Sequence, residues 1–170
     1  MRFSAAPTLE TERLVLRPYH HTDFDAFAAY FASQRSIYTD GPISRQTAWD
    51  LFTAGAGRWI IAGHGAWTIE RKVDGIAVGL VSLNTAIELP DPELGWILWA
   101  GFEGHGYAFE AAFNARAFAF EILQWPRLIS GIHQDNTASI KLAERLGAVY
   151  APDLRLPAEP ETRFYRHKAQ

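Results

Sequence analysis

The stretch FEGHGYAFEAAF, from Phe102 to Phe113, places two glycines one residue apart immediately before an apolar helical pattern. Glycine is a poor helix former and a common turn residue, so Gly104 and Gly106 predict a turn that leads into a helix. The first N–H groups of a helix have no partner within it, and the helix dipole favours negative charge there. Because glycine lacks a Cβ, an anion can also approach such a backbone closely. The local sequence therefore allows a plain turn or an anion-binding loop.

The common phosphate-binding patterns do not occur in this chain. There is no GxxxxGK[ST] sequence, and no GxGxxG follows the first predicted strand. We therefore do not expect ATP held on a P-loop or a dinucleotide held on a Rossmann unit.

Hydrophobic periodicity predicts ten elements in the order strand, helix, helix, three strands, helix, strand, helix and strand. Whether a further strand forms near Tyr150 is left open by the pattern. The predicted strands are Leu14–Tyr19, two runs joined by a hairpin turn at Asp74-Gly75, Leu94–Trp99, Arg127–His133, and RFYRHK near the end of the sequence. The predicted helices lie in HTDFDAFAAYFAS, in SRQTAWDLFTAG, from the glycine turn to about Leu123, and in DNTASIKLAERLGA. The expected fold class is α/β (α+β), with one mixed central β-sheet flanked by helices in a single domain over residues 1–170.

Capping residues mark the ends of three predicted helices. Thr22 and Asp25 have the spacing of a capping box at the first helix. Ser44 is the expected N-cap of the second helix. Gly147 is expected at the C-terminal cap of the last one.

Composition narrows the class of protein. The 170 residues are 48% hydrophobic and 21% charged, which is typical of a globular domain. A formal net charge of −3 argues against nucleic acid as a partner, and no apolar run is long enough for a signal peptide or a membrane span, so we expect a cytoplasmic protein. The chain has no cysteine, which excludes disulfides and a thiolate nucleophile. Its histidines show no metal-ligand spacing, so we expect no metal.

Three segments carry a family resemblance. LGWILWAGFEGHGYAFEA resembles the acetyl-CoA-binding segment of the GNAT superfamily of N-acetyltransferases, in which a strand runs into a [Q/R]-x-x-G-x-[G/A] loop at a helix start. Here the loop is EGHGYA, with Glu103 where Gln or Arg is usual. LETERLVLRPYHHTDFDAF is similar to the opening of the RimJ/RimL-type branch, which acetylates ribosomal-protein N-termini. HQDNTASIKLAERLGA resembles a later segment of that branch through Asn136, Ser139 and Gly147.

The resemblance implies a GNAT fold and acetyl-CoA or CoA as the cosubstrate. The strands Leu94–Trp99 and Arg127–His133 would splay apart, with the pantetheine arm of CoA paired like an added strand between them. Backbone N–H groups of the glycine loop would hold the pyrophosphate, while the His105 side chain faces solvent or touches a phosphate. The cofactor-binding residues expected from the resemblance are Leu98, Trp99, Gly104, His105, Gly106, Tyr107, Ala108 and Asn136.

The implied reaction transfers an acetyl group from a thioester to an amine, and it needs a base for the amine and an acid for the departing thiolate. Without cysteine, direct attack in a ternary complex is the simplest route, although serine or histidine covalent routes stay open. Ser139 is the candidate acid, or else it caps its helix. Glu93 is the candidate base, or else a solvated charge, and Glu88 and Asp91 are weaker candidates.

The acceptor amine is not identified by the sequence. Trp96 and Trp99 are candidates for lining its pocket, and the segments Tyr38–Trp59 and Leu83–Pro92 are expected to set specificity. A protein N-terminus and a small molecule are both open, as are a monomer and a homodimer. An alternative class is a catalytically silent module that senses or displays acyl-CoA, which Glu103 in the phosphate loop favours. A phosphate-binding enzyme of unrelated chemistry is a third alternative.

Overall fold

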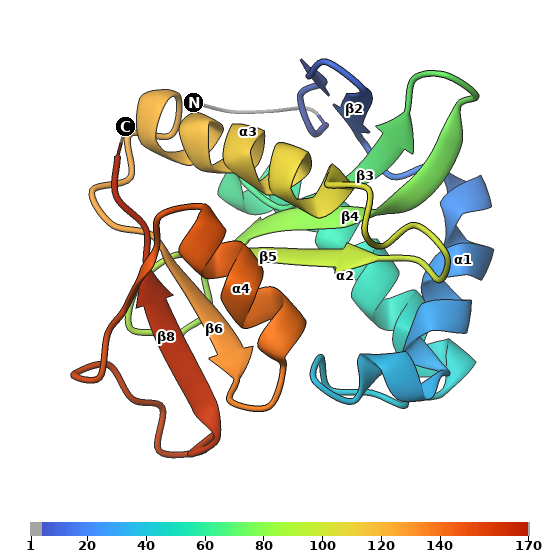
Figure 1. The fold of residues 1–170 in the computed structure, drawn as a ribbon. Helices are drawn as coiled ribbons and strands as arrows, with labels where there is room; N and C mark the ends of the chain where they lie inside the picture. The colour runs from blue at the N-terminus through green and yellow to red at the C-terminus, as the bar shows by residue number, and fades with distance from the viewer. Residues whose placement is uncertain (1–4, 170) are drawn as a thin grey trace.

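The computed structural model describes residues 5–169, within which one mixed sheet has the strand order β1-β2-β3-β4-β5-β6-β8-β7 (Figure 1). The strands are β1 (Leu9–Glu10), β2 (Leu14–Arg17), β3 (Ala66–Arg71), β4 (Ile76–Asn84), β5 (Glu93–Leu98), β6 (Ile129–His133), β7 (Val149–Tyr150) and β8 (Thr162–Arg166). The α-helices are α1 (Phe24–Phe31), α2 (Arg45–Ala62), α3 (Tyr107–Glu121) and α4 (Thr137–Arg145), and the short 3₁₀ helices are η1 (His21–Asp23) and η2 (Gln34–Ser36). None of the helices in this part of the chain has the length and apolarity needed to cross a membrane.

The predicted fold class and element order are confirmed, and the strand left open near Tyr150 is β7. The hairpin at Asp74-Gly75 is also confirmed, because β3 and β4 pair with Arg71 opposite Ile76 and Gly75 has a φ of 69°. The short β1 was not predicted. It has two residues and, among residues 5–169, pairs with β2 alone, so it carries too little pattern to be seen in the sequence.

The alternation of side chains along β4 creates two cores, one on each face of the sheet. Val81 and Leu83 pack in the core that includes α3, whereas Leu80 packs with α1 and α2. Figure 1 shows α3 lying across β4 and β5. The buried face of α3 is made largely of alanines, such as Ala111 and Ala115, so its backbone lies close to the sheet.

The second helix begins as predicted but ends later. The Ser44 hydroxyl accepts the Thr47 N–H at 3.1 Å, which confirms Ser44 as the N-cap. However, α2 continues beyond Gly55, where the apolar pattern ends. The reason is tertiary packing, because Trp59 in the later part of the helix is buried with its ring 4.5 Å from that of Trp67.

The expected capping box of Thr22 and Asp25 is wrong. The chain enters the helix through η1, and the carboxylate of Asp23 accepts the His20 N–H at 2.8 Å. Asp23 is buried and forms an ion pair with Arg17 at 2.7 Å. The carboxylate at this helix start is therefore the one that pairs with Arg17 of β2, and not the one that the capping-box spacing indicated.

The expected splay between the central strands is confirmed. β5 and β6 are parallel neighbours, but the only register pair between them is Glu93 with Ile129. Next to this pair, where the two strands meet, the Ile129 N–H donates to Pro92 O at 2.8 Å, and the Ser130 hydroxyl donates to Leu94 O at 2.6 Å. Beyond it the strands diverge, as Figure 1 shows, so one backbone edge of β5 is left free.

Candidate active site

The glycine loop between β5 and α3 presents unpaired backbone donors. Gly104 and Gly106 both have a φ of 80°, a left-handed conformation that disfavours other residues. Within the described residues, no N–H group from Gly104 to Phe109 makes a hydrogen bond, and the first to do so is that of Glu110, to Gly106 O at 3.1 Å. A run of free donors at the start of a long helix suits an anion.

The side chains of the loop are exposed or engaged with other residues. Glu103 forms an ion pair with Arg35 and accepts the Gly101 N–H at 2.9 Å, so its negative charge is compensated. His105 is exposed, with its ring stacked on that of Tyr107 at 5.6 Å. Tyr107 and the next residue, Ala108, are buried and anchor the helix start. The loop therefore offers its backbone rather than its side chains.

The free edge of β5 corrects the expectation for Trp99. The Trp99 N–H donates to Val78 O at 2.9 Å, on the β4 side of the strand. Because alternate residues of a strand direct their backbone groups to opposite edges, Leu98 and Trp96 are the residues that face β6. The Trp99 ring is buried beside Phe27, and Trp99 is not among the residues that line the cavity between β5 and β6.

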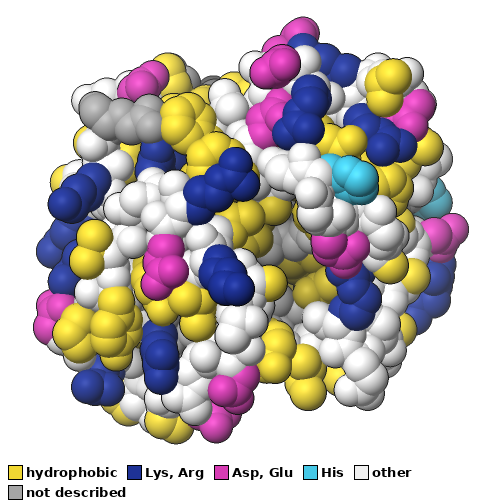
Figure 2. Space-filling model, viewed as in Figure 1, with side chains coloured by type: hydrophobic (Ala, Val, Ile, Leu, Met, Phe, Trp, Pro, Cys, Tyr) yellow, Lys and Arg dark blue, Asp and Glu magenta, His cyan; other side chains and the backbone are white. Residues whose placement is uncertain are grey.

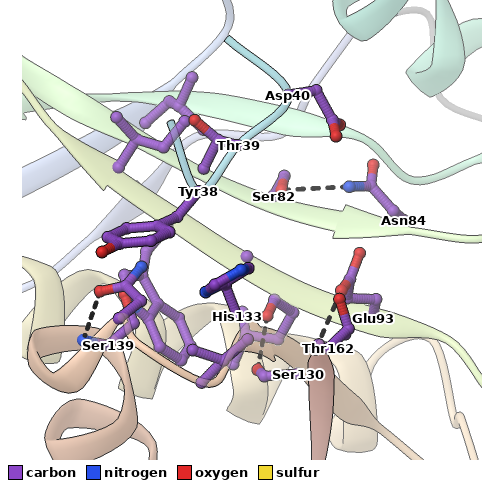
Figure 3. A pocket seen from close by; sticks show the side chains of 18 of the residues that line it. Tyr38, Thr39, Asp40, Ser82, Asn84, Glu93, Ser130, His133, Ser139 and Thr162 are labelled. Atoms are coloured by element: carbon purple, nitrogen blue, oxygen red, sulfur yellow. Dashed lines mark hydrogen bonds between the residues drawn. The ribbon is translucent and has the colours of Figure 1, made fainter. Parts of the chain in front are cut away.

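A cavity of about 680 Å³ opens where β5 and β6 separate. Figure 2 shows a hollow in this face of the molecule with hydrophobic side chains at its base. Both candidate catalytic residues and Asn136 line the cavity, and Figure 3 shows several of its polar side chains. The polar or charged residues that line it are Tyr19, Tyr38, Thr39, Asp40, Arg58, Ser82, Asn84, Glu93, Ser130, His133, Asn136, Ser139, Glu159, Glu161 and Thr162.

Glu93 lies where β5 and β6 are still paired, at the point from which the two strands diverge. Its Oε1 accepts the Gly131 N–H at 3.0 Å, and a Cβ on Gly131 would itself stand 3.0 Å from that oxygen. Burial, with smaller contributions from the negative charges of Glu159 and Asp40, raises the pKa of Glu93 to about 7. A carboxyl group with this pKa can exchange a proton near neutral pH.

The two weaker base candidates do not reach the cavity. Glu88 is exposed, and Asp91 is buried in an ion pair with Arg127 at 2.9 Å. Neither residue lines the cavity. Among the three carboxylates considered, Glu93 alone lines the cavity.

The start of α4 separates the roles of two predicted residues. The side chain of Asn136 accepts the Ser139 N–H at 3.2 Å, so Asn136 is the N-cap of this helix. The alternative in which Ser139 is the cap is therefore wrong. The Ser139 hydroxyl makes no hydrogen bond within residues 5–169, and it lines the cavity (Figure 3). The predicted C-terminal cap is confirmed by Gly147, which has a φ of 80°.

Several residues at the cavity were not singled out in the sequence. Tyr38 stacks on His133 with ring centroids 4.9 Å apart, which joins the loop after η2 to the end of β6. His133 also makes a 3.0 Å hydrogen bond to Glu161, which follows β7. The predicted specificity segments do supply cavity residues such as Asp40 and Asn84. The Glu159–Glu161 segment had no local signal, because it reaches the cavity only through the pairing of β8 with β6.

Comparisons with known proteins agree with this geometry. A family model described as "Acetyltransferase (GNAT) domain" matches residues 13–149. The chain is similar to the crystal structure of an acetyltransferase from Agrobacterium tumefaciens str. C58, with 39% identity, coverage of 99% of this chain and 97% of that chain, and a TM-score of 0.91.

Two more distant structures share the fold. One is a GNAT-family acetyltransferase from Bacillus anthracis, with 19% identity, coverage of 94% and 96%, and a TM-score of 0.76. The other is a RimL ribosomal L7/L12 alpha-N-protein acetyltransferase in complex with coenzyme A, with 14% identity, coverage of 96% and 98%, and a TM-score of 0.78.

Proposed function

Since the chain belongs to the GNAT acetyltransferase family, we propose that it transfers an acetyl group from acetyl-CoA to a primary amine by direct attack in a ternary complex. The observation that carries this proposal is that Glu93 and Ser139 both line one cavity, which opens where β5 and β6 diverge. A carboxyl that titrates near pH 7 and a hydroxyl with no hydrogen-bond partner among residues 5–169 are the two proton-transfer groups that the reaction needs.

The chain's own residues fit acetyl-CoA. The N–H groups of Gly104 to Ala108 would bind the pyrophosphate, and the free backbone groups of Leu98 and Trp96 would pair with the pantetheine amides. Asn136, which lines the cavity while capping α4, is placed for a further contact to the pantetheine arm. Acetyl-CoA supplies the activated acyl group, and the protein supplies binding, orientation and proton transfer.

The proposed transfer follows from these positions. The acceptor enters as an ammonium ion, and the Glu93 carboxylate takes one proton from its nitrogen. The freed lone pair attacks the acetyl carbonyl carbon, so that a C–N bond forms and the C–S bond breaks. The departing sulfur takes a proton from the Ser139 hydroxyl, and the nitrogen gives up its second proton to solvent. Ser139 then regains a proton from solvent, and Glu93 releases the proton that it took. The products are an N-acetylated amine and CoA.

The sequence motifs are the basis on which we propose the branch of the family and the kind of acceptor amine. We place the chain near the RimJ/RimL-type enzymes because of its opening pattern and the Asn136 to Ser139 segment, and we retain the cytoplasmic location expected from the sequence. A protein N-terminus or a small-molecule amine would be the acceptor, and a monomer or a homodimer would be the active form. The silent binding module loses its support, because the charge of Glu103 is compensated by Arg35.

Release of free thiol from acetyl-CoA, measured with a panel of amines and N-terminal peptides, tests the proposal. We expect amine-dependent release, and we expect CoA to raise the melting temperature because it binds the folded state. If CoA stabilises the protein and no amine is acetylated, the chain is a binding module. If CoA has no effect at millimolar concentration, the proposed cosubstrate is wrong.

A further inference from the structure

The opening segment of the chain reaches the glycine loop from the far side of the sequence. Thr11 and Arg13 lie between β1 and β2, within the stretch that resembles the RimJ/RimL-type opening. The Arg13 carbonyl accepts the Lys72 N–H at 2.9 Å, so its backbone is fixed to the end of β3. The acetyl transfer proposed above gives this segment no role, but its side chains contact the first turn of α3.

Glu110, in that first turn, receives three of these contacts. Its Oε1 accepts the Thr11 hydroxyl at 2.5 Å and the Arg13 N–H at 2.8 Å, and its Oε2 accepts Arg13 Nε at 2.7 Å. Burial alone would raise the pKa of Glu110, but these contacts outweigh it and hold that pKa below its usual value. Because the Glu110 N–H donates to Gly106 O, fixing Glu110 also fixes the start of the helix.

Arg13 extends from Glu110 to the loop itself, where its Nη1 donates to His105 O at 2.9 Å. Among residues 5–169 the one cis peptide bond precedes Pro42, so the bond between His105 and Gly106 is trans. In a planar trans peptide the C=O and the N–H point in opposite directions. Arg13 therefore directs the His105 carbonyl toward itself and the Gly106 N–H away from itself. That N–H is one of the unpaired donors of the loop.

The loop needs such a contact because glycine flanks His105 on both sides. Glycine adopts positive and negative φ about equally readily, so Gly104 and Gly106 alone do not select one loop conformation. A His105 carbonyl turned the other way would present negative partial charge to the phosphates. The Arg13 guanidinium is itself seated, 5.0 Å from the ring centroid of Tyr107. A loop ordered before the ligand arrives costs less to order on binding.

We infer that Arg13 is a positioning residue for CoA: anchored on Glu110, it holds the His105 carbonyl so that the N–H groups of the loop face the pyrophosphate. This inference rests on the proposed function and deepens it, because it gives the opening segment a part in binding the cosubstrate. Arg13 does not line the cavity that contains Glu93 and Ser139, so it acts on CoA binding and not on the transfer step.

The first test compares two acetyl donors in Arg13→Ala. Acetyl-CoA contains the pyrophosphate, whereas S-acetylpantetheine ends before it. We expect the Kd of CoA and the KM of acetyl-CoA to rise by about tenfold, the effect of losing contacts to a charged group, with kcat unchanged. With S-acetylpantetheine, kcat/KM should stay the same. The Kd of 3′-dephospho-CoA, which retains the pyrophosphate, should rise by the same factor as that of CoA.

Three further variants separate position from charge and from folding. Arg13→Lys keeps the positive charge, but one ammonium cannot reproduce the fork that joins Glu110 to His105, so most of the loss should remain. Glu110→Gln weakens the anchor with little change of shape, and it should raise the Kd of CoA by a smaller factor. It also serves if Arg13→Ala does not fold, which melting temperatures report.

Arg166→Ala is the matched control. Arg166 forms a similarly exposed ion pair, with Asp153 at 2.5 Å, and it lies outside both the glycine loop and the cavity. CoA affinity should therefore be unchanged in this variant.

Four results would overturn the inference. They are an unchanged Kd of CoA in Arg13→Ala, full affinity in Arg13→Lys, an equal loss with S-acetylpantetheine, and a loss that disappears with 3′-dephospho-CoA. The second would show that charge alone suffices, the third that Arg13 supports the fold in general, and the fourth that it serves the 3′-phosphate. Failure of the proposed function is distinguishable, because the unmodified protein would then neither bind CoA nor release thiol from acetyl-CoA.

Discussion

The two ends of β5 carry two sites that are built in opposite ways. After Leu98, the glycine loop offers backbone N–H groups from consecutive residues, and its side chains are buried, paired elsewhere or exposed. At Glu93, the cavity offers side chains that come from separate parts of the chain. A backbone site depends on the conformation of the loop, so it is sensitive to an added Cβ. A side-chain site depends on individual atoms, so it is sensitive to changes that preserve shape.

The largest expected effect is at the side-chain site. Glu93→Gln keeps the shape and an oxygen that can accept the Gly131 N–H, but it removes the base, so kcat/KM should fall by about 10²–10⁴-fold. CoA affinity should change little. Steady-state kinetics and calorimetric titration of CoA measure the two quantities. Glu88→Gln is the matched control, since Glu88 does not line the cavity. Turnover that persists in Glu93→Gln would remove Glu93 from the mechanism.

Ser139→Ala should lower kcat by about 10²-fold, because a thiolate departs with less assistance than an alkoxide needs. Acetyl-CoA should still bind, and the free energy of unfolding should stay nearly the same because Ser139 does not cap α4. Asn136→Ala serves as the contrast. It removes the actual cap and should cost about 1 kcal/mol in urea unfolding. Unchanged turnover in Ser139→Ala would return this hydroxyl to a structural role.

At the backbone site, Gly106→Val should weaken CoA binding by about 10- to 100-fold, or about 1.4–2.8 kcal/mol. The φ of 80° strains a β-branched residue, and a Cβ there would stand 3.3 Å from Arg13 Nη2. Gly57→Val is the control, because a Cβ at Gly57 meets no atom within 4 Å. Titration of both folded variants with CoA decides the point. Equal affinities would show that Gly106 serves the turn alone.

The smallest expected effect is a shift in pH dependence. Glu93 accepts a proton only when ionised, so kcat/KM of the unmodified protein should fall as the pH drops below about 7. The negative charge of Asp40 raises the pKa of Glu93, so Asp40→Asn should lower that pKa and move the acid limb to lower pH. A pH–rate profile with a monoamine measures the shift. A limb that moves to higher pH, or stays in place, would show that Asp40 does not act on Glu93.

Residues that act through their neighbours in sequence were predictable. Ser44 and Gly147 were found because a cap satisfies backbone groups within one turn of helix. Thr22 was wrongly chosen, since the buried pair of Asp23 with Arg17 outweighs local spacing. Trp99 was misassigned because the direction of its N–H depends on the register with β4, which no local pattern reveals.

The sequence by itself determined the fold class, the element order and the glycine loop at the start of α3, because periodicity, caps and missing Cβ atoms act over a few residues. Only the tertiary structure decided the composition of the cavity. Asp40, Glu93 and Glu159 are far apart in the chain, and they meet through the splay of β5 and β6 and the pairing of β6 with β8. The raised pKa of Glu93 arises from that meeting, because burial and neighbouring charges are properties of a place in the fold.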